Sequence, residues 1–128
     1  MCGLSVKPLH VRELSSLLSR FENFTASEIK EITLKSPTVI EIRLSVQDSA
    51  LEFDWIDLNF ELSSVNDARI LENSKLAYLD MSEGLSILFE ENLFAFCYGS
   101  YSSLATAKDS SFYIIAQSLK FEELPFSG

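Results

Sequence analysis

Residues 85–98 read LSILFEENLFAFCY, in which two apolar runs flank the dipeptide Glu91-Asn92. A two-residue turn at this dipeptide predicts a β-hairpin whose paired residues on one face are all apolar. These pairs are Phe89 with Phe94, Ile87 with Phe96 and Leu85 with Tyr98. On the other face the pairs are Leu88 with Ala95 and Ser86 with Cys97. Because neither face carries a charge, we expect this hairpin to lie centrally or to be covered on both sides.

Residues 29–46 predict a second hairpin. Ser36-Pro37-Thr38 serves as a three-residue loop between two strands, residues 29–34 and 39–46. The predicted pairs are Leu34 with Ile40, Ile32 with Ile42 and Glu31 with Arg43. Apolar and polar side chains alternate along residues 39–46, which is typical of a sheet with one buried and one solvated face.

The next connection predicts a two-residue turn at Asp48-Ser49. This turn pairs Val46 with Leu51, Leu44 with Phe53, Ile42 with Trp55 and Arg43 with Asp54. Beyond Trp55 the apolar positions change parity, since the even-numbered residues 56–62 are now the apolar ones. A one-residue shift of this kind predicts a β-bulge near Trp55-Ile56.

The two ends of the chain complete the expected fold. Residues 9–24 carry apolar side chains at helical spacing (Leu14, Leu17, Leu18 and Phe21), which predicts an amphipathic helix. Residues 99–111 are rich in serine and predict a surface loop, and residues 112–124 predict one or two strands that close the sheet. We therefore expect an α+β fold with one domain over residues 1–128. Its N-terminal amphipathic helix packs on a largely antiparallel, curved sheet of about six to eight strands.

Composition limits the class of protein. The chain has 128 residues, of which 47% are hydrophobic and 23% are charged, so a disordered or fibrous chain is excluded. The longest apolar run, residues 93–98, is too short to span a bilayer. Residues 1–20 contain no uninterrupted apolar segment of signal-peptide length. We therefore expect a cytoplasmic protein.

The negative charge is concentrated in the middle of the chain. The net charge is −9, and residues 44–107 alone carry eleven acidic residues against Arg69 and Lys75. Such a field repels the phosphates of nucleic acids and of anionic membranes, so neither is an expected partner. It attracts a basic protein and raises the rate of encounter with it.

The sequence offers no recognisable catalytic set. His10 is the only histidine, the cysteines are Cys2 and Cys97, and the four glycines are isolated from one another. These counts do not supply a zinc site or a phosphate-binding loop, and no cofactor is expected. Asp54 and Asp57 lie three residues apart and so fall on opposite faces of a strand, unless the predicted bulge restores them to one side. Cys97 is predicted to be a buried, protonated thiol.

Two runs carry a resemblance to a known family. Residues 55–61 read WIDLNFE and residues 65–70 read VNDARI. Together they resemble the tryptophan-led strand and following acidic turn of YxiG-like and related immunity proteins. The resemblance covers about half of the chain, through residue 98, and it transfers no individual binding residue. It implies tight one-to-one association with a secreted polymorphic toxin, and many such toxins are basic nucleases.

These observations lead to one expected function and two alternatives. The leading expectation is a non-enzymatic acidic protein, of unknown oligomeric state, that masks the active site of a basic toxin. The candidate partner-binding residues are the carboxylates Glu52, Asp54, Asp57, Glu61, Glu90 and Glu91 and the aromatic anchors Tyr98 and Tyr101. One alternative is a small-molecule binder or enzyme with a pocket lined by Trp55, Phe60, Phe89, Phe94 and Phe96. The other is a structural or assembly subunit.

Overall fold

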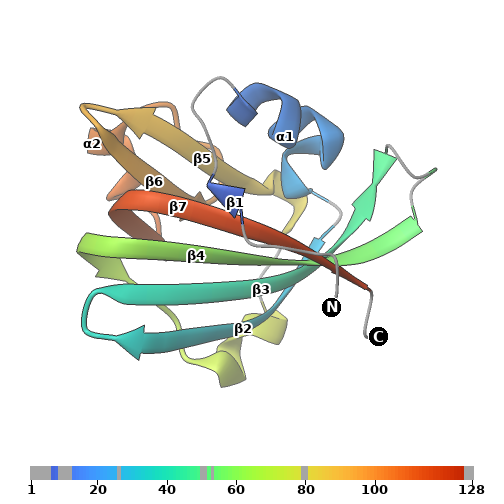
Figure 1. Cartoon of the computed structure of the whole chain (residues 1–128), viewed down its shortest axis with the longest axis horizontal. Helices are drawn as coiled ribbons and strands as arrows, with labels where there is room; N and C mark the ends of the chain where they lie inside the picture. The colour runs from blue at the N-terminus through green and yellow to red at the C-terminus, as the bar shows by residue number, and fades with distance from the viewer. Residues whose placement is uncertain are drawn as a thin grey trace.

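The computed structural model describes residues 7–8, 13–25, 27–49, 52, 54–78 and 81–125. Cys2 and His10 lie outside these residues. Most of the described chain forms one antiparallel sheet (Figure 1). Its six main strands are β2 (Ser27–Ser36), β3 (Val39–Asp48), β4 (Asp54–Arg69), β5 (Leu85–Glu90), β6 (Leu93–Tyr98) and β7 (Tyr113–Pro125). The short β1 (Lys7–Pro8) pairs with β7.

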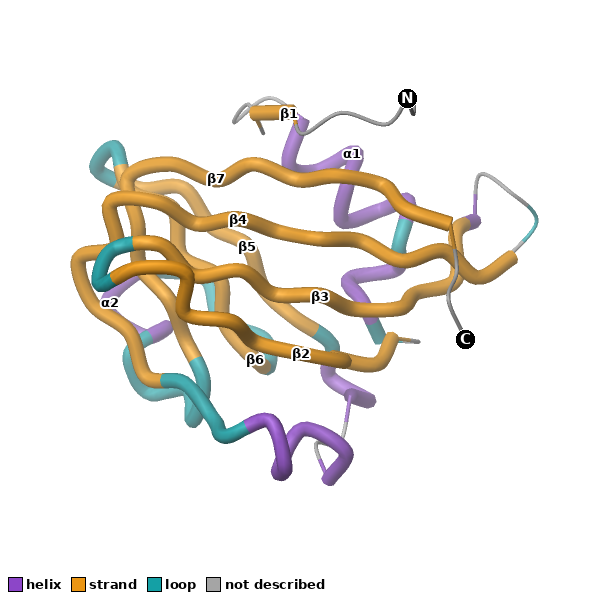
Figure 2. Tube along the Cα trace, turned by 60° about the horizontal axis from the view of Figure 1, so that its bottom comes forward, coloured by secondary structure: helices purple, strands orange, loops and turns teal. Residues whose placement is uncertain are grey.

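The strand order is β2-β3-β4-β7-β6-β5. The expected last strand is therefore a single strand, β7, but it lies inside the sheet between β4 and β6 and does not close an edge. β4 and β7 are the longest strands, and their pairing contains a β-bulge between Val65 and Asp67, next to Ser64 with a φ of 55°. Such bulges bend a strand and increase its twist. Figure 2 shows the resulting curved sheet, with β5 and β6 behind β3 and β4.

Two of the three predicted hairpin registers are confirmed. The β2–β3 pairs include Leu34 with Ile40, Ile32 with Ile42 and Glu31 with Arg43. The β5–β6 pairs are also those predicted, from Leu85 with Tyr98 to Phe89 with Phe94. Glu91 and Asn92 both have positive φ angles, 52° and 63°, as the tight turns that suit a twisted hairpin require.

The predicted β3–β4 register is wrong. β3 ends at Asp48 and β4 begins at Asp54, so the connection is longer than two residues. Val46 pairs with Ile56, Leu44 with Leu58 and Ile42 with Phe60. Arg43 accordingly lies opposite Asn59 and not opposite Asp54. The even-numbered apolar residues of β4 thus match the even-numbered ones of β3 without a bulge near Trp55-Ile56, because the longer loop absorbs the change in parity.

The helices are few and short. The N-terminal helix α1 spans only Leu14–Arg20, with Leu14 and Leu17 buried. It does not extend to residue 24, because Glu22, Asn23 and Phe24 all have left-handed φ angles of 51–61° in the turn η2 (Glu22–Phe24). The others are η4 (Asn73–Tyr78), η5 (Met81–Glu83) and α2 (Leu104–Ala107). The fold is therefore mostly sheet. No helix among the described residues is long and apolar enough to cross a membrane.

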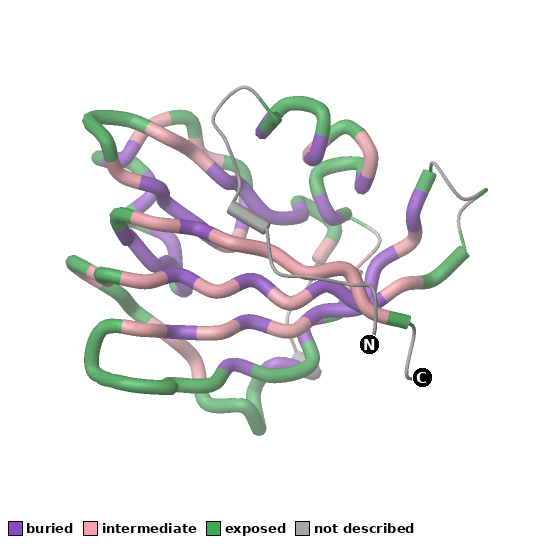
Figure 3. The backbone as a smooth tube through the Cα atoms, in the orientation of Figure 1, coloured by how far each residue is buried: buried purple, intermediate pink, exposed green. Residues whose placement is uncertain are grey.

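The main core lies inside the curve of the sheet. Buried and partly exposed residues alternate along β3 and β4 (Figure 3), and Phe60 of β4 contacts Phe96 of β6 at a ring-centroid distance of 5.4 Å. Leu17 of α1, Phe24 of η2 and Phe21 between the two elements belong to the same core. A smaller cluster on the other face of β6 and β7 is covered by α2, as expected for a hairpin that is apolar on both faces.

Candidate partner-binding surface

The predicted carboxylates do not lie together on one surface. Asp57 faces away from the main core, yet it is fully buried. The Ser45 hydroxyl donates a 2.6 Å hydrogen bond to its Oδ1, and Arg43 Nη2 lies 3.0 Å from its Oδ2. Asp57 is therefore an internal ion-pair partner and is not available to another protein.

Glu61 is also engaged by a cation of the protein itself. Lys35 Nζ lies 3.6 Å from Glu61 Oε1 and 3.3 Å from Glu41 Oε2. The hydrogen bond to Glu41 is the largest contribution that raises the pKa of Lys35, and Glu61 adds to it. Glu61 on the outer face of β4 therefore shares one cation of the protein itself with Glu41.

The remaining predicted carboxylates fall into two groups at different ends of the sheet. Glu52 and Asp54 are exposed beside the start of β4. Glu90 and Glu91 are exposed at the β5–β6 turn, close to Asp67 near the far end of β4. Nearly the whole length of β4 separates the groups, so one small interface does not contain both.

Glu90 and Glu91 border the largest of the described grooves, with a volume of about 580 Å³. We call it the α2 groove. Its lining consists of Asn66, Asp67, Glu90, Glu91, Leu93, Leu104, Ala105, Lys108 and Ile115. Three carboxylates and one ammonium group therefore surround a floor that contains Leu93, Leu104 and Ile115.

Hydrogen bonds fix the walls of the α2 groove. Glu90 Oε1 accepts a 3.0 Å hydrogen bond from the backbone N–H of Leu104, which joins the β5–β6 turn to α2. The Tyr113 hydroxyl donates to Asp67 Oδ2 at 3.1 Å, and Lys108 Nζ lies 3.9 Å from the same oxygen. Burial raises the pKa of Tyr113, and the Asp67 carboxylate raises it further. The Tyr113 hydroxyl therefore keeps its proton and continues to donate this hydrogen bond to Asp67.

The chemistry of the α2 groove is that of cation binding. An apolar floor accepts the methylene stem of a lysine or arginine, while the surrounding carboxylates accept its charged head. The lining contains no histidine, cysteine or serine that could form a pair of nucleophile and general base. Within the described residues, no group of three or more His, Cys, Asp and Glu side chains is arranged to hold a metal ion.

The two predicted aromatic anchors are half-buried. Tyr98 packs against the main core and Tyr101 against the smaller cluster under α2. They meet at a separate groove of about 290 Å³, whose other lining residues are Glu83, Gly99 and Ser111. The predicted anchors therefore lie outside the α2 groove.

The aromatic residues suggested for a ligand pocket occupy other places. Phe60 and Phe96 are fully buried and contact each other, and Phe94 packs against Phe89 at 4.8 Å. Trp55 is 40% exposed, and its position in β4 shares the outer face with Asp57. The five side chains therefore do not line one common cavity.

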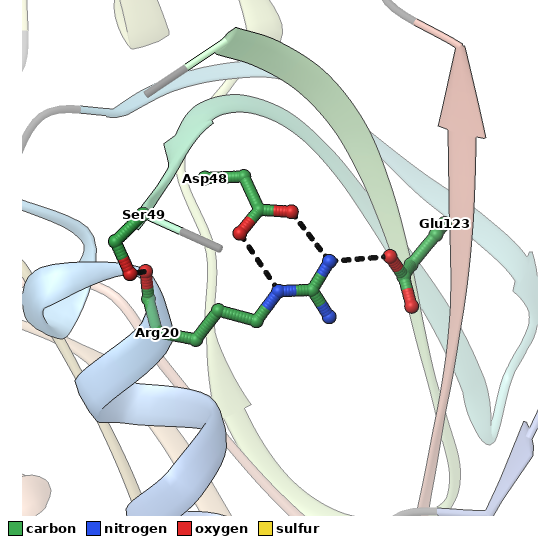
Figure 4. Close-up of polar contacts among 4 residues, drawn as sticks. All are labelled: Arg20, Asp48, Ser49 and Glu123. Atoms are coloured by element: carbon green, nitrogen blue, oxygen red, sulfur yellow. Dashed lines mark hydrogen bonds and ion pairs between the residues drawn. The ribbon is translucent and has the colours of Figure 1, made fainter. Parts of the chain in front are cut away.

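A charged cluster at the end of α1 has a structural role (Figure 4). Arg20 Nε donates to Asp48 Oδ1 at 2.8 Å, and its Nη2 donates to Glu123 Oε1 at 2.7 Å. The Ser49 hydroxyl donates to the backbone oxygen of Arg20 at 2.6 Å. Asp48 is fully buried, and the ion pairs of Arg20 with Asp48 and Glu123 fix α1 to β3 and β7.

The chain matches no protein-family profile, no curated protein sequence and no solved structure. Sequence reasoning selected Glu90 and Glu91 but missed Asp67 and Lys108. The strand pairing of Asp67 with Ile115, which are 48 positions apart, is what brings Asp67 to the groove.

Proposed function

We propose that this chain is a non-enzymatic cytoplasmic binding protein that neutralises a basic toxin, as the resemblance to immunity proteins implies. The observation that carries the proposal is the α2 groove, where Asp67, Glu90 and Glu91 surround an apolar floor. In the complex, a lysine or arginine from the rim of the toxin active site occupies this groove. The bound protein then blocks access of substrate to the toxin.

The charge of the whole chain supports the same function. A net charge of −9 accelerates encounter with a basic protein, whereas short-range contacts in the groove determine how long the complex lasts. Hydrogen bonds to Leu104 and Tyr113 hold Glu90 and Asp67 before the partner arrives. This preorganisation lowers the entropic cost of binding.

Lys108 makes the proposal specific. Its ammonium group already lies 3.9 Å from Asp67, so an incoming cation competes with it. The variant Lys108→Met removes the competing charge and retains an aliphatic side chain. This variant should therefore bind the partner more tightly. The same replacement of a surface lysine outside the groove should change the affinity little.

The first partner to test is the product of the reading frame immediately upstream, which should encode a secreted toxin with a basic C-terminal domain. Calorimetry should show one-to-one binding that weakens with salt. The double variant Glu90→Gln/Glu91→Gln should weaken it at least about tenfold, since each truncated charge pair contributes more than about 1 kcal/mol. Glutamine is chosen at position 90 because its amide oxygen can still accept the hydrogen bond from the N–H of Leu104.

The matched control is Glu52→Gln/Asp54→Asn, which changes the net charge equally at the other end of β4. It should alter the association rate slightly and leave the dissociation rate unchanged. Equal losses in the two double variants would show that only net charge matters and would reject the groove as the binding site. Absence of an upstream toxin, or failure of its product to bind, would reject the immunity function.

A further inference from the structure

Three shallow grooves meet at Tyr101, which does not line the α2 groove. Their volumes are about 260, 290 and 420 Å³, and Tyr101 lines all three. Their lining includes two charged residues, Glu83 and Asp109, both negative. Neither carboxylate forms an ion pair with another residue in the described part of the chain. The surroundings of Tyr101 are therefore complementary to a cation.

The backbone beside Tyr101 is held in place. Ser86 Oγ accepts a 3.0 Å hydrogen bond from the N–H of Tyr101 and donates a 2.7 Å hydrogen bond to the oxygen of Gly99. Gly99 has a φ of 102°, and a Cβ at this position would lie 3.2 Å from Tyr101 Cε2. The tyrosine ring thus lies directly against a glycine backbone. A rigid aromatic ring of this kind gives contact area with little loss of entropy on binding.

α2 places the two surfaces side by side. Ala105 and Lys108 line the α2 groove, whereas Thr106 and Asp109 line one of the grooves at Tyr101. Ala105 and Thr106 belong to α2, and Lys108 and Asp109 directly follow it, so the two surfaces meet along this short segment. A single partner that covers α2 can contact both surfaces.

We infer that Tyr101 is the docking point for an arginine side chain of the partner, with the guanidinium group stacked on the ring between Glu83 and Asp109. This inference rests on the proposed function, because that function supplies the basic partner. Arginine fits better than lysine, since its planar and weakly hydrated head stacks on an aromatic face while its edges donate to carboxylates. A second copy of this chain does not fit, because it would bring further carboxylates to Glu83 and Asp109.

The test uses N-acetyl-arginine-N-methylamide as the probe and the corresponding lysine compound as its control, each titrated into the full chain and followed by NMR. The arginine probe should shift the amide signals of Tyr101, Glu83 and Asp109 in a saturable manner, and bind there at least about threefold more tightly than the lysine probe. Tyr101→Leu should remove this preference and Tyr101→Phe should retain it. Glu83→Gln/Asp109→Asn, which changes exposed side chains only, should weaken the arginine probe at least about threefold.

Equal binding of the two probes, or a preference for arginine that survives Tyr101→Leu, would overturn the inference. The small probes do not depend on the identity of the toxin, so the two proposals can fail separately. Arginine binding at Tyr101 without binding of the upstream product would retain Tyr101 as an arginine-binding site and reject the proposed function. A toxin complex that depends on Glu90 and Glu91 but is unchanged by Tyr101→Leu would reject this inference alone.

Discussion

Arg20 connects three elements through one guanidinium group, and its replacement should be costly. In Arg20→Met, the fully buried carboxylate of Asp48 loses its cation, while an unbranched, mainly aliphatic side chain is retained. Breaking a buried ion pair from one side costs about 3–5 kcal/mol. We expect a loss near the lower limit, about 3 kcal/mol, because Arg20 itself is 28% exposed. The free energy of unfolding in urea measures this loss.

Lys35→Met is the matched control for this variant. Lys35 also forms ion pairs with two carboxylates, Glu41 and Glu61, but on the solvated outer face of the sheet. Its replacement should leave the unfolding midpoint nearly unchanged, since exposed ion pairs contribute little. Similar losses for Arg20→Met and Lys35→Met would show that burial of Asp48 is not what makes the cluster important.

Cys97 should make stability depend on pH in the alkaline range. The thiol is fully buried, and burial raises its pKa to about 11. In the unfolded chain the thiol ionises near about pH 8.5, so the unfolded state loses its proton first as the pH rises. The contribution of Cys97 is therefore complete below about pH 8.5 and is lost between that value and about pH 11.

The measurement compares wild type with Cys97→Ala in urea at several pH values. Across this window the wild type should lose stability more steeply, by up to about 1.4 kcal/mol per pH unit. Tyr113, whose pKa is also raised, titrates in both proteins and cancels from the difference. Parallel curves for the two proteins would contradict burial of a protonated thiol.

At the scale of elements, the contact between η2 and the start of β5 depends on Gly84. Gly84 has a φ of 71°, and a Cβ there would lie 2.0 Å from the backbone oxygen of Asn23. Gly84→Ala should therefore cost at least about 2 kcal/mol, from the left-handed conformation and from displacement of η2. Gly99→Ala shares the positive φ but meets only the Tyr101 ring, so its loss should be smaller. Thermal unfolding of the two variants gives the comparison, and equal losses would show that the Asn23 contact is unimportant.

The exposed edge strand β2 is modified in ways that discourage pairing with other chains. Its register with β3 shifts between Ile29 and Glu31 and again between Leu34 and Ser36. The extra residues at these two bulges are Lys30 and Lys35. Asn73 Oδ1 in η4 also accepts the N–H of Ile32 at 2.8 Å. Bulges, lysines and a covering segment are established means of protecting a sheet edge.

The sequence predicts a strand register correctly where the connection between the two strands is short. The turns at Glu91-Asn92 and around Pro37 are short, so partners across them are close in sequence and the apolar pattern determines the register. The β3–β4 connection is longer, and the two apolar runs around Trp55 have opposite parity. The sequence prediction paired the first run with β3 and placed a bulge before the second, whereas the second run is the one that pairs with the apolar residues of β3. The central pairing of β4 with β7 joins distant residues, which local periodicity does not specify.

The candidate site could likewise be predicted only where its residues lie close together in the sequence. Glu90 and Glu91 could be found because they belong to a local turn, whereas Asp67 and Lys108 reach the α2 groove through long-range packing. Alternation placed Asp57 correctly on the outer face but could not show that Ser45 and Arg43 enclose it. Composition gives the total charge of the molecule, and only the fold divides that charge between internal ion pairs and surfaces that a partner can reach.

At the scale of the whole molecule, added salt should act in opposite directions on folding and on partner binding. Acidic residues number 19 against 10 lysines and arginines, so even complete pairing leaves nine carboxylates without a cation. Their mutual repulsion destabilises the compact chain, and salt screens it. The free energy of unfolding in urea should therefore rise between about 20 and 300 mM NaCl, while the affinity for the basic partner falls.

These opposite responses separate two sources of electrostatic energy. Urea is the suitable denaturant because it is uncharged and leaves the ionic strength to the added salt. A stability that falls with salt would mean that internal ion pairs such as Arg20–Asp48 outweigh the repulsion among the surplus carboxylates. In that case the negative charge would stabilise the fold itself and would not be a surplus that is displayed for a cationic partner.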